Sequence, residues 1–280
     1  MAEGRTTGKH RLAASVLRRV LREPAGPEGG RDPDLWFEEA LGSTERFFSR
    51  LPELSFEGKS VLDYGCGIGA TPIWLAGRGA VRAVGIDIQS VDFAEAKLER
   101  DYPHLRDRVS FHRIEPSQGV GEERFDLVIS KDTFEHVDDP DAYVATMKGY
   151  LKPDGEIAIG FGPLWRSPWG GHIDFMTRLP WAHLVFPEQV ILSERRRYRP
   201  EEDPSRFEEI RGGLNRMTLA RFLETMARSG LVHRYLSTNR SEGARTRGRG
   251  AVIGAMRIGS RIPGLREYCT LNVYSVWSRG

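Results

Sequence analysis

A glycine-rich turn that follows a short apolar run constrains the fold of this chain more than any other feature. The run at 60–64 has the composition of a buried strand, and glycines follow at 65, 67 and 69, where a helical pattern begins. Glycine lets the backbone turn tightly and lets a ligand approach it closely. In an open α/β sheet this turn lies outside the carboxyl end of its strand, where ligands bind. We therefore expect a ligand-binding turn.

Short apolar runs and helical patterns alternate on both sides of this turn. Strands are predicted at 60–64, 82–86, 109–113, 125–130, 156–161, 231–236 and 268–277. Helices are predicted at 9–22, 34–51, 70–77, 90–101, 140–151 and 218–230, the last with Thr218 as its N-cap. Strands that alternate with helices form a parallel sheet covered on both faces. The fold class is therefore α/β, with a doubly wound sheet.

The alternation stops between about 163 and 215. This segment is rich in tryptophan, proline and arginine without a clear period, so we expect an inserted cap after the fifth strand. Residues 1–31 carry seven basic and three acidic side chains and are expected to be a flexible basic segment, in which the helix at 9–22 packs on the main domain. The domain itself is expected at 32–280, with a solvated arginine-rich loop at 240–250.

Two carboxylates narrow the choice of ligand. The glycine pattern alone also fits a dinucleotide, because Gly65–Ala70 satisfies G-x-G-x-x-A. Asp63, however, stands two residues before the first glycine and would repel a pyrophosphate on the turn. A ligand that brings a sulfonium and an ammonium group suits this acid. Asp87 ends the second predicted strand, where an acid binds two ribose hydroxyls. The pattern thus favours S-adenosylmethionine over NAD.

Four motifs in order resemble those of class I, Rossmann-like S-adenosylmethionine-dependent methyltransferases, in particular the small-molecule branch that includes the ubiquinone-pathway enzymes. They are Val61–Gly69, Val84–Ile88, Phe125–Ser130 with Phe134–Val137, and Leu151–Glu156. The resemblance covers about residues 60–160 and leaves out the N-terminal helices and the cap. It implies a seven-stranded, mostly parallel sheet whose last strand is antiparallel.

The resemblance also implies roles for individual residues. Asp63 and the backbone of the turn would hold the methionine part of the cofactor, Asp87 the ribose, and Ile88 and Glu115 the adenine. Pro116 departs from the family pattern, because a proline has no N–H to donate to the adenine ring. The cofactor contacts implied in this way are Asp63, Gly65, Cys66, Gly67, Gly69, Asp87, Ile88, Glu115 and Ser130.

Two histidines are candidates for the proton transfer that accompanies methylation. His136 follows the fourth predicted strand, and His172 lies in the loop after the fifth. A histidine, with a pKa of about 6.5, is a suitable base for an acidic hydroxyl. Either residue could instead hold neighbouring backbone, and His172 could join Asp174 on a metal, although no spacing specifies a metal site. We expect no metal.

Aromatic side chains mark the cap as the candidate substrate site. They are Trp165, Trp169, Phe175 and Trp181. Such a cluster is typical of a lid over an apolar or aromatic acceptor, and equally of a small core beneath a long insertion.

These observations predict a cytoplasmic enzyme that methylates a small, aromatic or apolar metabolite, with oxygen as the favoured acceptor atom and nitrogen and carbon as the alternatives. An RNA or protein methyltransferase is the alternative, suggested by the arginine-rich segments, and a Rossmann protein that binds NAD is the second. No stretch approaches the roughly 18 apolar residues that a membrane span needs. Nucleic acid is not an expected partner, and the sequence does not specify the oligomeric state.

Overall fold

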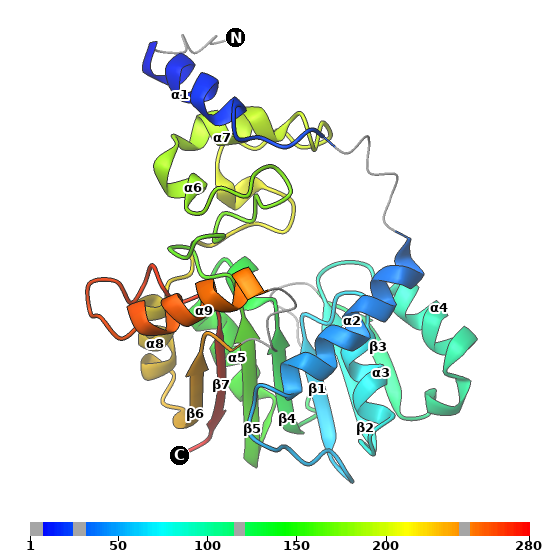
Figure 1. Cartoon of the computed structure of the whole chain (residues 1–280). Helices are drawn as coiled ribbons and strands as arrows, with labels where there is room; N and C mark the ends of the chain where they lie inside the picture. The colour runs from blue at the N-terminus through cyan, green and yellow to red at the C-terminus, as the bar shows by residue number, and fades with distance from the viewer. Residues whose placement is uncertain (1–7, 25–31, 115–120, 241–246) are drawn as a thin grey trace.

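A seven-stranded sheet organises the chain in the computed structural model, which describes residues 8–24, 32–114, 121–240 and 247–280 (Figure 1). The strands are β1 (Ser60–Tyr64), β2 (Arg82–Asp87), β3 (Val109–Arg113), β4 (Phe125–Lys131), β5 (Leu151–Phe161), β6 (Val232–Thr238) and β7 (Val273–Ser278). Their order is β3-β2-β1-β4-β5-β7-β6, and β7 runs antiparallel to both of its neighbours. The predicted mostly parallel sheet with an antiparallel last strand is confirmed.

Helices cover both faces of this sheet. The first face is covered by α2 (Pro33–Phe48), α3 (Ala70–Ala76) and α4 (Asp92–Asp101), whose buried side chains share one apolar cluster with β1, β2 and β3. The second face is covered by α5 (Pro140–Gly149) and α8 (Leu219–Arg228), which pack around Phe134, Phe161 and Phe222. The sheet is therefore buried on both sides, as its nearly continuous apolar strands predict.

Short polar side chains fix where these helices begin. The Asp139 carboxylate accepts a hydrogen bond from the Ala142 N–H, with Pro140 in the first turn of α5. Thr218 caps α8 in the same way, through its hydroxyl and the Arg221 N–H. Both satisfy a backbone donor that the helix leaves free. The predicted N-cap at Thr218 is confirmed.

Several elements differ from those predicted. The first helix ends at Arg18 rather than 22, and the second ends at Phe48 rather than 51. Strand β5 begins at Leu151 rather than 156, because Leu151 already pairs with Phe125 before a register shift. Residues 268–272 precede β7 and are not part of it. The expected loop at 240–250 is partly a helix, since α9 spans Arg247–Gly259; residues 241–246 lie outside the described part of the chain. Glycines spaced along this stretch hid the helix from propensity arguments.

The cap has a core of its own. It contains α6 (Ala182–Val185), α7 (Glu188–Arg195) and a 3-10 turn at Phe207–Glu209, packed around Met176, Ile191 and Phe207. It follows the carboxyl end of β5 directly and stands beyond that edge of the sheet (Figure 1).

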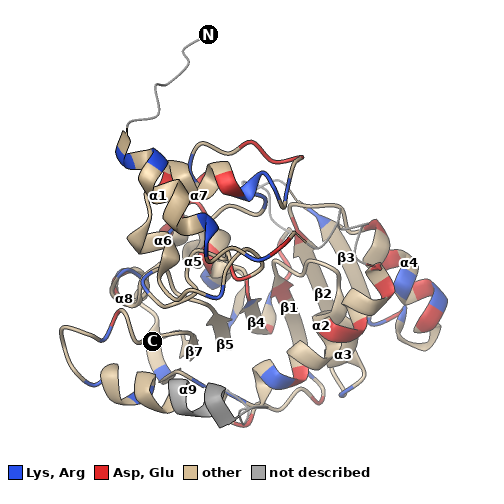
Figure 2. Cartoon of the chain, turned by 45° about the horizontal axis from the view of Figure 1, so that its top comes forward, with Lys and Arg blue, Asp and Glu red and all other residues tan. Residues whose placement is uncertain are grey.

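The N-terminal helix α1 (Gly8–Arg18) packs on this cap and not on the sheet. Leu17 is buried in the cap core, and Arg18 binds Glu194 of α7 at 2.6 Å. Leu21, just after α1, pairs with Thr177 of the cap. Figures 1 and 2 both place α1 beside α7. The helix predicted at 9–22 is therefore anchored, although the wider division of the chain at residue 31 stays a prediction.

Candidate active site

The glycine-rich turn lies at the carboxyl end of β1 and carries three left-handed residues. Gly65, Gly67 and Gly69 have φ angles of 92°, 50° and 83°. A Cβ on Gly65 would lie 2.4 Å from Thr133, and one on Gly69 would lie 2.4 Å from Ala94. A Cβ on Gly67 would meet no described atom within 4 Å. Two of the glycines therefore serve close packing, while Gly67 leaves open space in front of the turn.

Asp63 places a buried carboxyl group directly beneath this turn. The side chain is 2% exposed and is hydrogen-bonded to Thr71. Among the described residues its Oδ1 atom has no hydrogen-bond partner. Burial raises the pKa of Asp63 to about 7, although the Lys131 cation opposes the shift. Because buried polar atoms are nearly always paired, Oδ1 marks a position where a donor or a cation is missing.

Asp87 joins the turn to the loop after β2. Its Oδ2 accepts a hydrogen bond from the Gly67 N–H at 2.8 Å, and its Oδ1 accepts one from the Gln89 N–H at 2.9 Å. Ile88 beside it is 57% exposed. The predicted ribose and adenine contacts therefore border the open space at Gly67. Glu115, the other predicted adenine contact, lies outside the described residues.

Cys66 and Ser130 are buried and engaged within the protein. Burial raises the pKa of the Cys66 thiol well above its usual range, so this side chain is a packed neutral thiol. The Ser130 hydroxyl lies 3.2 Å from the Tyr143 hydroxyl, which donates to the Tyr64 carbonyl. These side chains brace β1 and β4 behind the turn. Their role as cofactor contacts stays a prediction.

The structure brings the two candidate histidines together. The rings of His136 and His172 are perpendicular, with centroids 5.6 Å apart. His136 follows β4 in a 3-10 turn (Phe134–His136), and His172 returns from the loop after β5 with a φ of 49°. Burial and the neighbouring His136 lower the pKa of His172 to about 4, so it is neutral at physiological pH. The described residues hold no metal-ligating group of histidine, cysteine or carboxylate side chains.

Glu135 is a site residue that the sequence analysis missed. It is 4% exposed, its Oε1 accepts a long hydrogen bond from the Gly162 N–H, and its Oε2 has no partner in the described part of the chain. Burial and the nearby Asp132 raise the pKa of Glu135 to about 8, so the carboxyl is largely protonated near neutrality. The signal available in the sequence was an acid between Phe134 and His136, inside the motif Phe134–Val137.

The four cap aromatics do not converge on one surface. Trp165 packs against His183 and Phe207, and Phe175 packs against Tyr198. The Trp181 indole donates to the Arg166 carbonyl at 3.1 Å. Trp169 is half-buried, and its carbonyl accepts a hydrogen bond from the His172 N–H. The small-core interpretation therefore accounts for Trp165 and Phe175, and substrate contact by the four residues stays a prediction.

Comparison with known families shows which kind of domain contains the glycine-rich turn and the two histidines. Residues 37–190 match the family model described as a methyltransferase domain, which covers more than half of the chain. The chain belongs to this family. The methyltransferase domain therefore begins in α2 and extends through the glycine-rich turn, both histidines and α6.

Individual relatives match the methyltransferase domain over shorter stretches. The Ubiquinone biosynthesis O-methyltransferase of Rhodopseudomonas palustris (strain TIE-1) is 32% identical over 103 residues, which are 37% of this chain and 40% of that protein. The Magnesium-protoporphyrin O-methyltransferase of Rhodobacter capsulatus is 41% identical over 97 residues, 33% and 40% of the two chains. The matches thus span about 40% of the length of these relatives.

The fold of the methyltransferase domain is shared with solved structures. A crystal structure of an S-adenosylmethionine dependent methyltransferase from Mesorhizobium loti superimposes with a TM-score of 0.51 at 18% identity, covering 89% of this chain and 100% of that one. Geranyl diphosphate methyltransferase in complex with SAM gives a TM-score of 0.53 at 13% identity, covering 92% and 94%. At sequence identities of 18% and 13%, the similarity shows a shared fold only.

Proposed function

We propose that this chain binds S-adenosylmethionine and transfers its methyl group to an oxygen of a small-molecule acceptor. One observation carries the proposal: the buried Asp63 carboxyl, whose Oδ1 lacks a partner among the described residues, lies beneath a turn that Gly67 leaves open. The family membership of the domain and the names of the two relatives described above, both of them O-methyltransferases, support it.

The residues present fit this cofactor better than they fit NAD. The ammonium group of the methionine part supplies the donor and the positive charge that Asp63 lacks. Each carboxylate oxygen of Asp87 accepts one backbone N–H, and each keeps a second lone pair with which to accept a ribose hydroxyl. A pyrophosphate would bring negative charge to the same place and would raise the free energy of the complex.

The acceptor side of the reaction falls to the histidines. When bound, the cofactor supplies a methyl group that its sulfonium already activates. The protein has to hold the acceptor in line, exclude water and take up the hydroxyl proton. His172 is neutral and its Nε2 has no partner within the described chain, so the lone pair of this nitrogen is available for that proton. The burial that lowers its pKa to about 4 also makes it a weak base.

A small molecule is also favoured over RNA or a protein as the methyl acceptor. No described feature favours RNA or a protein as the acceptor, and the arginine-rich segment that suggested them is in part the helix α9. The described part of the chain contains no helix that is both long and apolar enough to cross a membrane. We place the enzyme in the cytoplasm as part of this proposal.

Two measurements test the proposal. S-adenosylhomocysteine at a concentration of about 100 times its Kd should stabilise the protein by about 2.7 kcal/mol, and NAD at the same concentration should not. Radiolabelled methyl transfer into fractionated metabolite extract, with RNA and protein fractions as controls, identifies the acceptor class. No stabilisation by S-adenosylhomocysteine, or label only in macromolecules, would overturn it.

A further inference from the structure

His136 and His172 each use one ring nitrogen to bind a backbone carbonyl. The Nδ1 atom of His136 lies 2.7 Å from the Gly213 carbonyl oxygen. The His172 ring bonds to the backbone of Pro163, which has a carbonyl but no N–H. A carbonyl only accepts, so in both cases the ring nitrogen must carry the proton.

This arrangement fixes the tautomer of both rings. Since Nε2 of His172 is the nitrogen without a partner in the described chain, its Nδ1 is the one that donates to Pro163. A neutral imidazole with a proton on Nδ1 exposes a lone pair at Nε2. Both rings of the pair therefore offer Nε2 as a proton acceptor, and neither has an N–H left to donate to a ligand.

The cap segment 212–217 holds the His136 side of this pair. Asn215 forms three hydrogen bonds to the turn that carries His136. Its side-chain amide donates to the carbonyls of Phe134 and Val137 at 2.8 and 2.7 Å, and its backbone N–H donates to Glu135 at 2.9 Å. With the Gly213 carbonyl, the segment thus binds four consecutive residues, 134–137.

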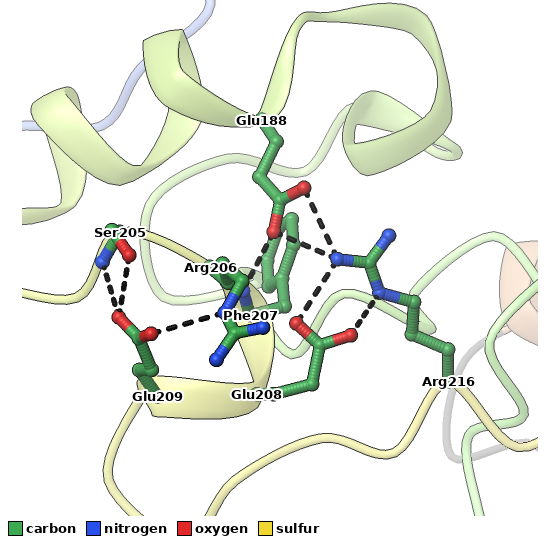
Figure 3. A network of polar contacts seen from close by, with 7 residues as sticks. All are labelled: Glu188, Ser205, Arg206, Phe207, Glu208, Glu209 and Arg216. Carbon is green, nitrogen blue, oxygen red and sulfur yellow. Dashed lines mark hydrogen bonds and ion pairs between the residues drawn. The ribbon is translucent and has the colours of Figure 1, made fainter.

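The same segment is fixed at its other end inside the cap. Leu214 is buried in the cap core. Arg216, with a φ of 54°, forms ion pairs with Glu188 of α7 at 2.9 Å and with Glu208 at 2.6 Å (Figure 3). Glu188 in turn accepts from the Phe207 N–H at 2.7 Å. The segment is therefore held rigidly between the cap and the turn at the end of β4.

We propose that Asn215 is a positioning residue for proton transfer: by binding the 134–137 turn to the cap, it keeps His136 on the Gly213 carbonyl and the two histidines in one proton-accepting pair. The proposal rests on the proposed function. In the reaction the acceptor O–H bond breaks, its proton goes to Nε2 of His172, the new O–CH3 bond forms, and the electron pair of the S–CH3 bond stays on sulfur. His136 holds its place beside His172 through the Gly213 carbonyl.

The groups that surround the pair make its protonation state sensitive to this geometry. His136 and His183 both lower the pKa of His172, after burial, whereas Asp174 raises it. A His136 ring that rotates away from Gly213 can take the other tautomer and present an N–H where a lone pair is needed. Substitution of Asn215 should thus change which ring nitrogen of His136 carries the proton. This change can be measured without knowing the methyl acceptor.

The test is side-chain 15N NMR of the full-length protein saturated with S-adenosylhomocysteine, recorded from pH 5 to 9. We expect both histidines of the wild type to carry the proton on Nδ1. In Asn215→Ala, and in the isosteric Asn215→Asp that lacks the two donors, His136 should become a mixture of tautomers. In Asn215→Asp its pKa should also rise, because the new carboxylate favours the imidazolium.

Asn239→Ala is the matched control. Like Asn215, Asn239 donates from its side-chain amide to a backbone carbonyl, that of Cys269, but it lies in front of β7. Asn239 is buried and left-handed, whereas Asn215 is half-buried. We expect Asn239→Ala to lower stability without changing either histidine. Once an acceptor is identified, the turnover number at saturating substrate should fall about tenfold or more in the Asn215 variants only. In Asn215→Asp, the acidic side of the pH profile of turnover should also shift.

An unchanged His136 tautomer and pKa in folded Asn215→Ala and Asn215→Asp overturns the positioning role. So does the same change in Asn239→Ala. A wild type that does not bind S-adenosylhomocysteine contradicts the proposed function instead, so the two failures are distinguishable.

Discussion

The turn after β1 and the cap after β5 are built in different ways. The turn is held by backbone geometry, with three left-handed glycines within five residues and a carboxyl group beneath them. The cap is held by its own apolar core and by ion pairs between side chains far apart in sequence, such as Arg18 with Glu194. The proposed cofactor-binding turn is thus encoded by adjacent residues, whereas the proposed acceptor site depends on contacts that form only when the chain has folded.

The first prediction asks whether the two regions also unfold separately. Phe125 is fully buried under the sheet and Phe207 is 1% exposed in the cap core, so truncating either to alanine should cost about 3–5 kcal/mol. We expect Phe125→Ala to lower the stability of the whole protein and Phe207→Ala to unfold the cap alone. Urea titrations followed by tryptophan fluorescence and by circular dichroism would separate these cases. Coincident transitions in Phe207→Ala would contradict an independent cap.

The second prediction distinguishes a glycine needed for close packing, Gly69, from one needed for the approach of the ligand, Gly67. A Cβ at Gly69 lies 2.4 Å from Ala94 and adds overpacking of about 1–3 kcal/mol to the left-handed strain, which is roughly 1–2 kcal/mol. Gly67→Ala should carry only the strain. Thermal unfolding should therefore rank Gly69→Ala below Gly67→Ala, while calorimetry with S-adenosylhomocysteine should show that Gly67→Ala loses affinity. Equal stabilities would mean that Ala94 moves freely.

The third prediction compares one residue from each region. Asp87→Ala removes an acceptor for two ribose hydroxyls and should weaken S-adenosylhomocysteine binding about ten- to hundredfold, the equivalent of roughly 1.5–3 kcal/mol. His172→Ala should change this affinity much less and should lower turnover. Isothermal titration gives the first quantity and single-turnover methyl transfer the second. If His172→Ala loses the cofactor while turnover per bound cofactor is kept, the assignment of His172 is wrong.

The fourth prediction concerns the dependence of stability and of cofactor affinity on pH. Burial raises the pKa of Asp63 from 3.8 to about 7, so this group stabilises the fold least when pH exceeds 7. The unfolded carboxyl ionises near 3.8, so the contribution to stability falls as pH rises between these values. The ammonium group of the cofactor prefers the ionised carboxyl, so affinity should instead increase through pH 7. Asp63→Asn should flatten both curves, and Asp126→Asn is a control outside the turn. An affinity profile that Asp63→Asn leaves unchanged would exclude this coupling.

The sequence predicts the sheet and the turn well because each depends on contiguous residues. Apolar runs locate the strands, and Thr218 locates a helix start. The glycines with Asp63 and Asp87 mark the edge of the sheet at which we propose that the cofactor binds. The pairing of His136 with His172 could not be predicted, because it depends on how the loop after β5 returns to the end of β4. Asn215 and Glu135 were missed for the same reason, since their significance comes from partners across the fold.

The attachment of α1 to the cap sets an upper limit to the distance between the end of this segment and the start of α2. Pro24 follows the segment packed on the cap, and Asp32 caps α2, which packs on α3 in the main domain. Eight residue steps separate these points, so the chain between them reaches at most about 29 Å when fully extended. The packing of α1 on the cap is therefore compatible with the start of α2 only within that distance.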